Sequence, residues 1–237
     1  MNHGTAALAR GLAVLEALAD VEDERDDPGV VELTEIVGGD KSQLSRALAT
    51  LEEGGWVERD RETLGYRLGW RVYGVAARAG DRRLLEAARP VLRDLVAEFG
   101  ESVHLSVREN DMVLTLLSES PPATLHAPAR VGGLTPIATT SAGRVLVSEL
   151  DGTELRALGL GDRAAAVAEA GRRGYAIVRE EFEPGLVAAA APIRDASGAI
   201  VAALNVSAPR FRFDGRLEAA AARLLVAAAE VSRAIGG

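Results

Sequence analysis

Residues 40–51, with the sequence DKSQLSRALATL, predict an amphipathic helix with a capped start. Asp40 is a good helix N-cap, and Gln43 three residues later can return a hydrogen bond to the Asp40 amide, as in a capping box. The apolar residues recur at helical spacing and predict a core-facing stripe of Leu44, Ala47, Leu48 and Leu51. The polar residues of the first turns lie on the other faces, and they are Lys41, Ser42, Gln43, Ser45 and Arg46. This helix therefore presents hydrogen-bond donors outward from its first turns.

The residues around this helix predict a winged helix-turn-helix. Residues 30–37 have the apolar spacing of a short helix, and Gly38 with Gly39 breaks the chain directly before the capped helix. Residues 56–59 and 66–68 flank a polar turn and predict a β-hairpin, the wing. The alternative is an ordinary helical hairpin beside a small ribbon. The order of capped helix, turn and arginine-bearing hairpin favours the winged helix.

The charge of this region is acidic. Residues 1–71 carry eight basic and fifteen acidic side chains, a balance of −7, whereas a DNA-binding domain usually shows a basic footprint. Six of the acids lie between Asp20 and Asp27, and a charge run of this kind predicts a solvated loop. Any DNA-binding surface must therefore be local, and nonspecific affinity for DNA should be weak.

Two more helices are expected in the N-terminal part of the chain. The first is predicted from an apolar stripe that would pack under the helix-turn-helix, formed by Leu8, Leu12, Leu15 and Leu18. The second is a linker helix after the wing, in which Trp70 and Tyr73 are expected to serve in packing. We therefore expect a winged helix-turn-helix domain over residues 1–69, a linker helix over residues 70–81 and a second domain over residues 82–237.

The second domain is predicted to be of the α+β class. A strong apolar stripe predicts a helix over residues 84–99, and period-2 alternation starts a strand at Val103. Further strands are expected at residues 112–117, 125–131, 174–178, 186–193 and 199–207, with Gly132, Gly133 and Pro136 in a loop. Helices are expected at residues 142–150, capped by Ser141, and at residues 214–234. Strands in hairpins with helices at both ends imply an antiparallel sheet flanked by helices.

Length and composition limit the class of protein. The 237 residues suit two domains with cores of normal size. The absence of cysteine from the sequence excludes disulfides, thiol nucleophiles and cysteine-ligated zinc. The sequence has neither a run of about 18 apolar residues nor the pattern of a signal peptide, so we expect a cytoplasmic protein without membrane contact.

The joint order of these segments resembles the IclR family of bacterial transcriptional regulators. The N-terminal matches are RGLAVL (10–15), KSQLSRAL (41–48), GGWVER (54–59) and YRLG (66–69). The C-terminal matches are ARPVL (88–92), GESVHL (100–105), TSAGR (140–144), RGYA (173–176), EEFEPG (180–185) and AAPI (190–193). No single segment is specific, but together they cover nearly the whole chain in register.

The resemblance implies a winged helix-turn-helix that binds a palindromic DNA operator as a dimer or as a dimer of dimers. It also implies a linker helix and a GAF-like domain that binds a small organic effector, in proteins that typically repress catabolic operons. The side chains that would contact DNA are Lys41, Ser42, Gln43, Ser45 and Arg46 in the major groove, with Arg59, Arg61 and Arg67 from the wing. Glutamine and arginine can pair with base edges, while serine and lysine suit phosphates, so Arg46 has the strongest claim to a base.

The resemblance also implies an effector pocket. Its residues would be Thr140, Ser141, Ala142, Leu186, Ala188, Asn205 and Ser207. The amides at the start of a helix can hold a carboxylate without a cationic side chain, although Ser141 taken alone is a plain N-cap. Ala188 stands where the family often has cysteine, and Val178 where an acidic residue is common. The pocket should therefore be more apolar than one that binds small hydroxy or keto acids.

An enzyme is the less favoured class. His3, His104 and His126 lack the spacing of metal ligands, and His104 is expected to face water or a neighbouring acid. Glu180 and Glu181 are consecutive, so their carboxylates should point apart as solvated charges. We expect no catalytic residue, cofactor or metal ion, and therefore a regulator. The alternative from another class is a sensory protein whose winged helix binds protein instead of DNA.

Overall fold

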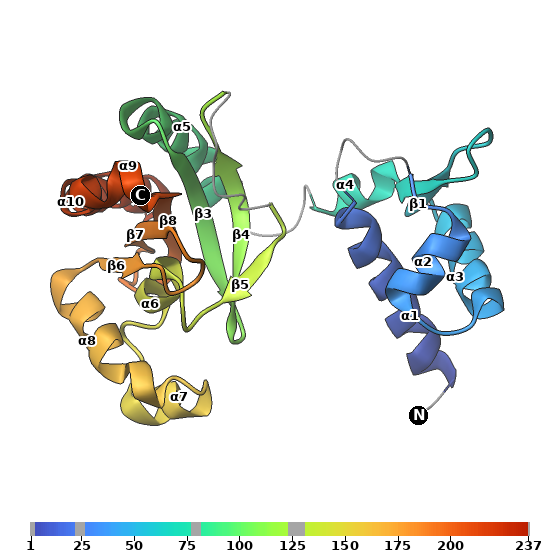
Figure 1. The fold of residues 1–237 in the computed structure, drawn as a ribbon, viewed down its shortest axis with the longest axis horizontal. Coiled ribbons are helices and arrows are strands. Elements are labelled where there is room, and N and C mark those ends of the chain that lie inside the picture. The colour runs from blue at the N-terminus through green and yellow to red at the C-terminus, as the bar shows by residue number, and fades with distance from the viewer. Residues whose placement is uncertain (1–2, 22–26, 77–81, 123–130, 237) are drawn as a thin grey trace. The chain divides into compact units, whose positions relative to one another are not determined.

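The chain divides into two compact units, Met1–Gly80 and Asp81–Gly237 (Figure 1). The computed structural model describes residues 3–21, 27–76, 82–122 and 131–236. The first unit consists of α1 (His3–Ala19), α2 (Val30–Val37), α3 (Lys41–Glu53), β1 (Val57–Arg59), β2 (Tyr66–Leu68) and α4 (Trp70–Ala76).

The first unit is built as the sequence predicts for a winged helix-turn-helix. Gly38, at φ 78°, ends α2, and Asp40 caps α3 two residues later. Strands β1 and β2 pair antiparallel, with Glu58 opposite Arg67, and form the wing. The buried core that joins the helices to the wing consists of Val14, Ala17, Leu18, Leu33, Leu44, Leu48, Val57 and Tyr66.

The predicted apolar stripe of α1 is wrong in half of its residues. Leu8 and Leu12 are 66% and 52% exposed, while Val14 and Ala17 are buried with Leu18. Val14, Ala17 and Leu18 follow the spacing of one helix face, and Leu12 is rotated by about 200° from Val14 around the helix axis. The contacts with α2 and α3 therefore select a different face of α1 from the one that the leucines mark.

The aromatic residues of α4 are not packed into the core of the first unit. The rings of Trp70 and Tyr73 meet edge to face with their centroids 6.3 Å apart. They remain 79% and 69% exposed. Both rings were expected to pack. Within the described part of this unit, the ring contact that they make is the one with each other.

The second unit is an antiparallel sheet with helices on both faces. Its strands are β3 (Ser102–Glu109), β4 (Met112–Glu119), β5 (Leu134–Pro136), β6 (Ala176–Arg179), β7 (Leu186–Arg194) and β8 (Ile200–Pro209), in the order β5-β4-β3-β8-β7-β6. Its α-helices are α5 (Arg82–Phe99), α6 (Ser141–Leu146), α7 (Gly152–Ala157), α8 (Ala164–Arg173), α9 (Arg210–Phe213) and α10 (Leu217–Gly236). Each neighbouring pair of strands is antiparallel.

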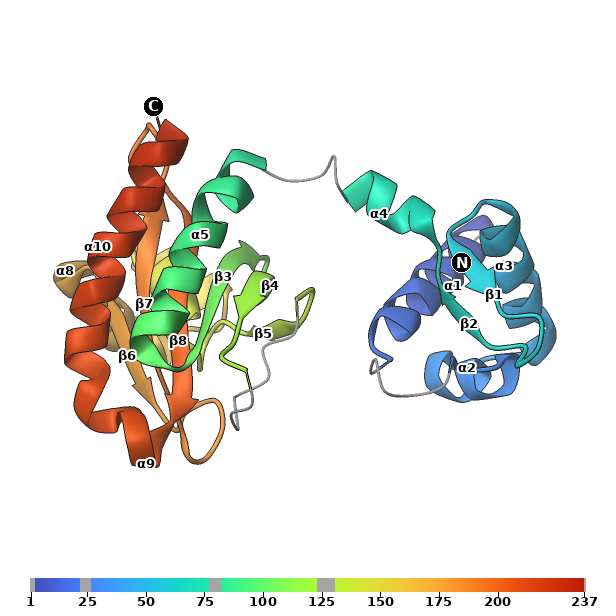
Figure 2. The same ribbon diagram turned by 90° about the horizontal axis from the view of Figure 1, so that it is seen from above.

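The two faces of this sheet have separate cores. Helices α5 and α10 lie side by side across one face (Figure 2) and bury Leu92, Leu224 and Leu204. Helices α6 and α8 contribute to the core on the other face, with Val145 and Val167 among its buried residues. Because successive residues of a strand point to opposite faces, the alternate residues of β3 and β8 are available to the α6 face. A cavity opens on that face.

Three expectations for the second unit need correction or fall outside the described residues. Residues 134–136 form β5 rather than a loop, because they pair with β4. The helix expected at residues 142–150 runs only from Ser141 to Leu146, and its N-cap is Thr140, whose hydroxyl accepts from the Gly143 amide at 3.1 Å. The strand expected at residues 125–131 lies almost entirely outside the described residues.

Helices α7 and α8 were not anticipated. A capping box between Asp151 and Glu154 starts α7 and so separates it from α6. Gly174, at φ 75°, ends α8 directly before β6. None of the helices in the described ranges is both long and apolar enough to cross a membrane.

Candidate functional sites

The start of α3 is held by a side-chain cap. The Asp40 carboxylate accepts hydrogen bonds from the Ser42 amide at 2.9 Å, from the Gln43 amide at 3.2 Å and from the Ser42 hydroxyl. The bond from the Ser42 hydroxyl, followed by those from the two amides, lowers the pKa of the Asp40 carboxyl. The return bond expected from the Gln43 side chain is not formed among the described residues. The carboxylate alone satisfies these donors, so the end is a simple N-cap and Gln43 stays exposed.

All five residues expected to face DNA from α3 are exposed. They are Lys41, Ser42, Gln43, Ser45 and Arg46. On the other side of the helix Leu44 and Leu48 are fully buried and fix it on the core, so the exposed side chains project from a rigid element. The Ser42 hydroxyl is engaged in the cap, whereas Arg46 makes no ion pair within the described residues.

The three wing arginines differ in how far they are already engaged. Arg67 pairs with Glu58 on the neighbouring strand at 3.1 Å. The Arg59 guanidinium lies 5.3 Å from the centre of the Tyr66 ring. Arg61 is exposed in the turn between the strands. Of the wing cations, Arg67 is therefore the one whose charge is offset by a direct partner.

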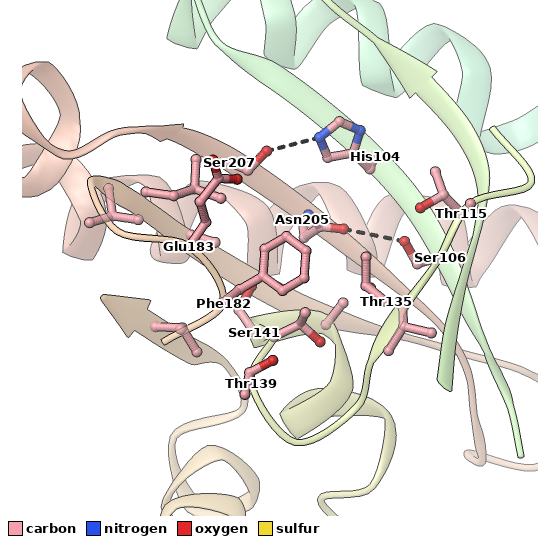
Figure 3. Close-up of a pocket in the computed structure, with 18 of the residues that line it drawn as sticks. His104, Ser106, Thr115, Thr135, Thr139, Ser141, Phe182, Glu183, Asn205 and Ser207 are labelled. Carbon is pink, nitrogen blue, oxygen red and sulfur yellow. Dashed lines mark hydrogen bonds between the residues drawn. The ribbon is translucent and has the colours of Figure 1, made fainter. Parts of the chain in front are cut away.

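The second candidate site is a cavity of about 220 Å³ in the second unit (Figure 3). It lies between the α6 face of the sheet, the start of α6 and the loop that joins β6 to β7. All seven residues expected to bind an effector line it, namely Thr140, Ser141, Ala142, Leu186, Ala188, Asn205 and Ser207. The fold of the second unit thus brings residues that are far apart in sequence to one cavity.

The start of α6 forms one wall of this cavity. The Thr140 hydroxyl and carbonyl accept from the amides of Gly143 and Arg144, which leaves the Ser141 and Ala142 amides at the cavity wall. A side chain at Gly143 would place its Cβ 2.7 Å from the Ile137 carbonyl carbon, so only glycine lets this helix approach so closely. The close packing of Gly143 therefore positions the two amides.

His104 forms part of the cavity, and the sequence analysis missed it. The ring is buried instead of facing water, with Nδ1 3.0 Å from the Ser118 hydroxyl and Nε2 3.0 Å from the Ser207 hydroxyl. Burial lowers the pKa of His104 to about 4, so the ring is neutral at neutral pH. The alternation of polar residues along β3 is the signal that places His104 on the same face as Asn205, its partner on β8.

Besides the carboxylate of Glu183, the remaining polar lining of the cavity consists of hydroxyl groups that were not predicted from the sequence. They belong to Ser106, Thr115, Thr135 and Thr139. The Ser106 hydroxyl donates to Asn205 Oδ1 at 3.5 Å (Figure 3). The two departures from the family pattern, Val178 and Ala188, are both in the wall and contribute apolar surface there. The cavity therefore combines apolar walls with neutral hydrogen-bonding groups and one carboxylate, that of Glu183.

The loop over the cavity is held by ion pairs. Glu181 pairs with Arg144 and, at 2.7 Å, with Arg163. Glu180 pairs with Arg210. The carboxylates of Glu180 and Glu181 were expected to point apart as solvated charges. They do point to different partners, but both form ion pairs. Arginines within reach of the loop compensate their charge, which the sequence does not reveal.

The histidines do not form a metal site in the part of the chain that is described. His126 and the His3 side chain lie outside that part. Within it, no group of three or more histidine, cysteine, aspartate or glutamate residues could hold a metal ion. Both ring nitrogens of His104 lie at hydrogen-bond distance from serine hydroxyls, those of Ser118 and Ser207.

Two family models match the chain. One describes the IclR helix-turn-helix domain and matches residues 7–61, and the other describes the C-terminal domain of the bacterial transcriptional regulator IclR and matches residues 77–233.

Curated relatives match over almost the full length. The HTH-type transcriptional regulator BhcR of Paracoccus denitrificans is 31% identical over 98% of this chain and 88% of its own. The transcriptional repressor IclR of Escherichia coli is 28% identical over 98% of this chain and 90% of its own.

Solved structures have the same fold. A crystal structure of an IclR homolog from Microbacterium hydrocarbonoxydans, complexed with 4-hydroxybenzoate, has a TM-score of 0.83 at 24% identity and covers 97% of this chain and 98% of that chain. The IclR transcriptional regulator from Alicyclobacillus acidocaldarius has a TM-score of 0.82 at 24% identity, with coverages of 98% and 99%.

Proposed function

The chain belongs to the IclR family of bacterial transcriptional regulators, and on this premise we propose that it is a DNA-binding repressor controlled by a small metabolite. In this proposal it binds a palindromic operator as a homodimer or a dimer of dimers. A small organic acid or a related compound in the second unit then changes its affinity for DNA. The genes under its control form a catabolic operon.

One observation carries the DNA-binding half of the proposal. The polar residues at the start of α3 are exposed together on one rigid helix, while Leu44 and Leu48 anchor its other face. A helix of this kind can enter the major groove with its N-terminal side chains at the base edges. The acidic balance of residues 1–71 means that bulk charge contributes little. Specific contacts near Arg46 must supply the affinity.

The DNA-binding half is tested with Arg46→Ala. Since Arg46 is exposed and free of ion pairs in the described part, its removal should leave folding unchanged and lower operator affinity by about 1–3 kcal/mol. A mobility-shift titration on the chain's own promoter region measures this. Arg233→Ala on α10 removes the same charge from the other unit and serves as the control. Equal affinity for the wild type and Arg46→Ala would contradict the assignment.

The cavity supports the effector half. Its volume of about 220 Å³ equals roughly seven water molecules in the liquid, which is the scale of a small metabolite. An acid would place its carboxylate at the amides of Ser141 and Ala142, with hydroxyl groups such as that of Ser207 nearby. The related protein from Microbacterium hydrocarbonoxydans was crystallised with 4-hydroxybenzoate, an acid of this size.

The effector half is tested with Ser207→Leu. The larger apolar side chain should fill the cavity beside His104 and remove the hydroxyl, so that organic acids no longer raise the thermal unfolding midpoint. A panel of small acids that includes 4-hydroxybenzoate serves as the probe. Operator binding by the same variant without ligand should remain intact, which shows that the first unit is folded, and a cooperative thermal transition without ligand shows the same for the second unit. A full ligand-induced shift in Ser207→Leu would rule this cavity out.

A further inference from the structure

The loop that joins β6 to β7 carries three glutamates, and one of them differs from the other two. Glu180 is paired with Arg210, and Glu181 with Arg144 and Arg163. Glu183 has no ion pair or side-chain hydrogen bond within the described residues, and it lines the cavity (Figure 3). The cavity therefore has, at its exposed edge, a carboxylate without a partner among the described residues.

Among the described residues, no cation forms a direct ion pair with Glu183. Among the described residues that line the cavity there is neither arginine nor lysine. The four arginines that pair around this loop are each bound to another carboxylate, and they are Arg144, Arg163, Arg179 and Arg210. The one basic ring in the lining, His104, is neutral because burial lowers its pKa to about 4. Arg144 and Arg163 share Glu181, so the charges of this cluster balance once Glu183 is counted. None of these guanidinium groups forms an ion pair with Glu183, however, which leaves a place for a ligand cation beside that carboxylate.

The residue before Glu183 adds an aromatic surface. Phe182 is 45% exposed, and its ring lies over the cavity in Figure 3. The face of an aromatic ring and a carboxylate each attract an ammonium group, the ring through its quadrupole and the carboxylate through its charge. A neutral hydroxyl group would gain only the hydrogen bond to the carboxylate. A second ligand carboxylate at this position would be repelled by Glu183.

We propose that the effector is a small amino acid-like compound whose ammonium group pairs with Glu183 beside Phe182. Its carboxylate lies at the start of α6, and an apolar body about the size of one ring lies against Val178 and Leu186. The assignment rests on the proposed function of the cavity as the effector site, and it names the class of ligand. Dicarboxylic acids are the class that the cavity selects against.

Three benzoates of nearly equal size test the assignment on the full-length chain. They differ only in the group opposite the carboxylate: 4-(aminomethyl)benzoate has an ammonium group, 4-methylbenzoate a methyl group and terephthalate a second carboxylate. Isothermal titration calorimetry at neutral pH should give a Kd for 4-(aminomethyl)benzoate about tenfold lower than that for 4-methylbenzoate. Terephthalate should bind more weakly than either.

Two substitutions of Glu183 sharpen the test. Glu183→Gln removes the charge and should bring 4-(aminomethyl)benzoate to the affinity of 4-methylbenzoate, a loss of about tenfold. Glu183→Lys should reverse the preference in favour of terephthalate. Glu230→Gln on α10 removes one carboxylate far along the chain from this loop and should leave all three Kd values unchanged. Unchanged unfolding midpoints without ligand confirm that the variants are folded.

The possible outcomes separate this inference from the proposed function. If 4-(aminomethyl)benzoate binds the wild type no more tightly than 4-methylbenzoate, or does not bind, the amine assignment is overturned. If the other two benzoates still bind the wild type and fail to bind Ser207→Leu, the cavity remains the effector site and only the ligand class is wrong. Operator binding, measured separately, is independent of both results.

Discussion

The exposed end of α3 and the cavity of the second unit differ in how their residues are brought together. The cap at the start of α3 is built from local contacts, namely the hydrogen bonds that the Asp40 carboxylate accepts from Ser42 and Gln43. The cavity joins residues far apart in sequence, as in the bond between His104 and Ser207. A substitution of an exposed residue on α3 should therefore change binding alone. A substitution that breaks a buried long-range contact of the cavity wall should change binding and folding together.

The largest effect is expected from Gly143→Ala, at the tightest contact of the cavity wall. The new Cβ would overlap the Ile137 backbone, which cannot move without displacing the start of α6. We expect the free energy of unfolding of the second unit to fall by about 4 kcal/mol, measured by urea denaturation followed by circular dichroism.

Gly215→Ala is the matched control for that substitution. No heavy atom outside its immediate chain neighbours lies within 4 Å of a Cβ built at Gly215, so its effect on unfolding should stay within about 0.5 kcal/mol. Equal effects of the two substitutions would show that the close approach of α6 does not matter for the fold. Long-range packing at Gly143 would then not determine the stability of the second unit.

The next effect is a pH dependence of stability due to His104. Its pKa is about 4 in the folded chain and about 6.5 when unfolded, so the unfolded state binds the proton first as the pH falls. Stability is therefore fully present above about pH 6.5 and decreases toward pH 4, by about 3 kcal/mol in total.

Comparison with His104→Gln isolates this effect from the titration of the acids. Urea denaturation of both proteins between neutral and acidic pH should show a smaller loss of stability in the variant. The difference between the two curves should grow as the pH falls below about 6.5. Parallel curves would mean that His104 is not held in its neutral form.

The same contrast explains which parts of the structure could be predicted from sequence. The cap at Asp40, the break at Gly38 and the wing are encoded within a few residues, so their positions follow from local patterns. The face of α1 that is buried depends on where α2 and α3 pack, and Leu8 and Leu12 gave a false signal.

In the second unit the predictions from sequence are wrong where contacts between distant residues decide between two structures that the local sequence allows equally. Thr140 and Ser141 are neighbouring residues with hydroxyl groups, and either can cap a helix. In the structure Thr140 is the N-cap, and the helix that it caps packs closely against Ile137 at Gly143. Strand β5 has only three residues and is defined by pairing with β4. Alternation places His104 on one face of β3, but only the helices that cover that face make it a cavity wall.

The smallest effect is expected in the wing, where one ion pair can be opened without touching the fold. Glu58→Gln releases Arg67, whose guanidinium lies 3.1 Å from the Glu58 carboxylate. We expect a gain in operator affinity of about 0.5 kcal/mol and a salt dependence steeper by up to about one phosphate contact, measured by mobility shift at several salt concentrations. Stability should not change measurably, because the pair is exposed.

Glu62→Gln separates the release of Arg67 from a general change in charge. It removes the same charge from the same wing, but no ion pair of the described residues involves Glu62. If both substitutions raise the affinity equally, the gain is due to net charge and Arg67 does not contact DNA. If only Glu58→Gln raises it, and Arg67→Ala in that background abolishes the gain, the wing binds phosphate through Arg67. An exposed site then responds to a single charge through binding alone, unlike the buried contact between His104 and Ser207 in the cavity wall.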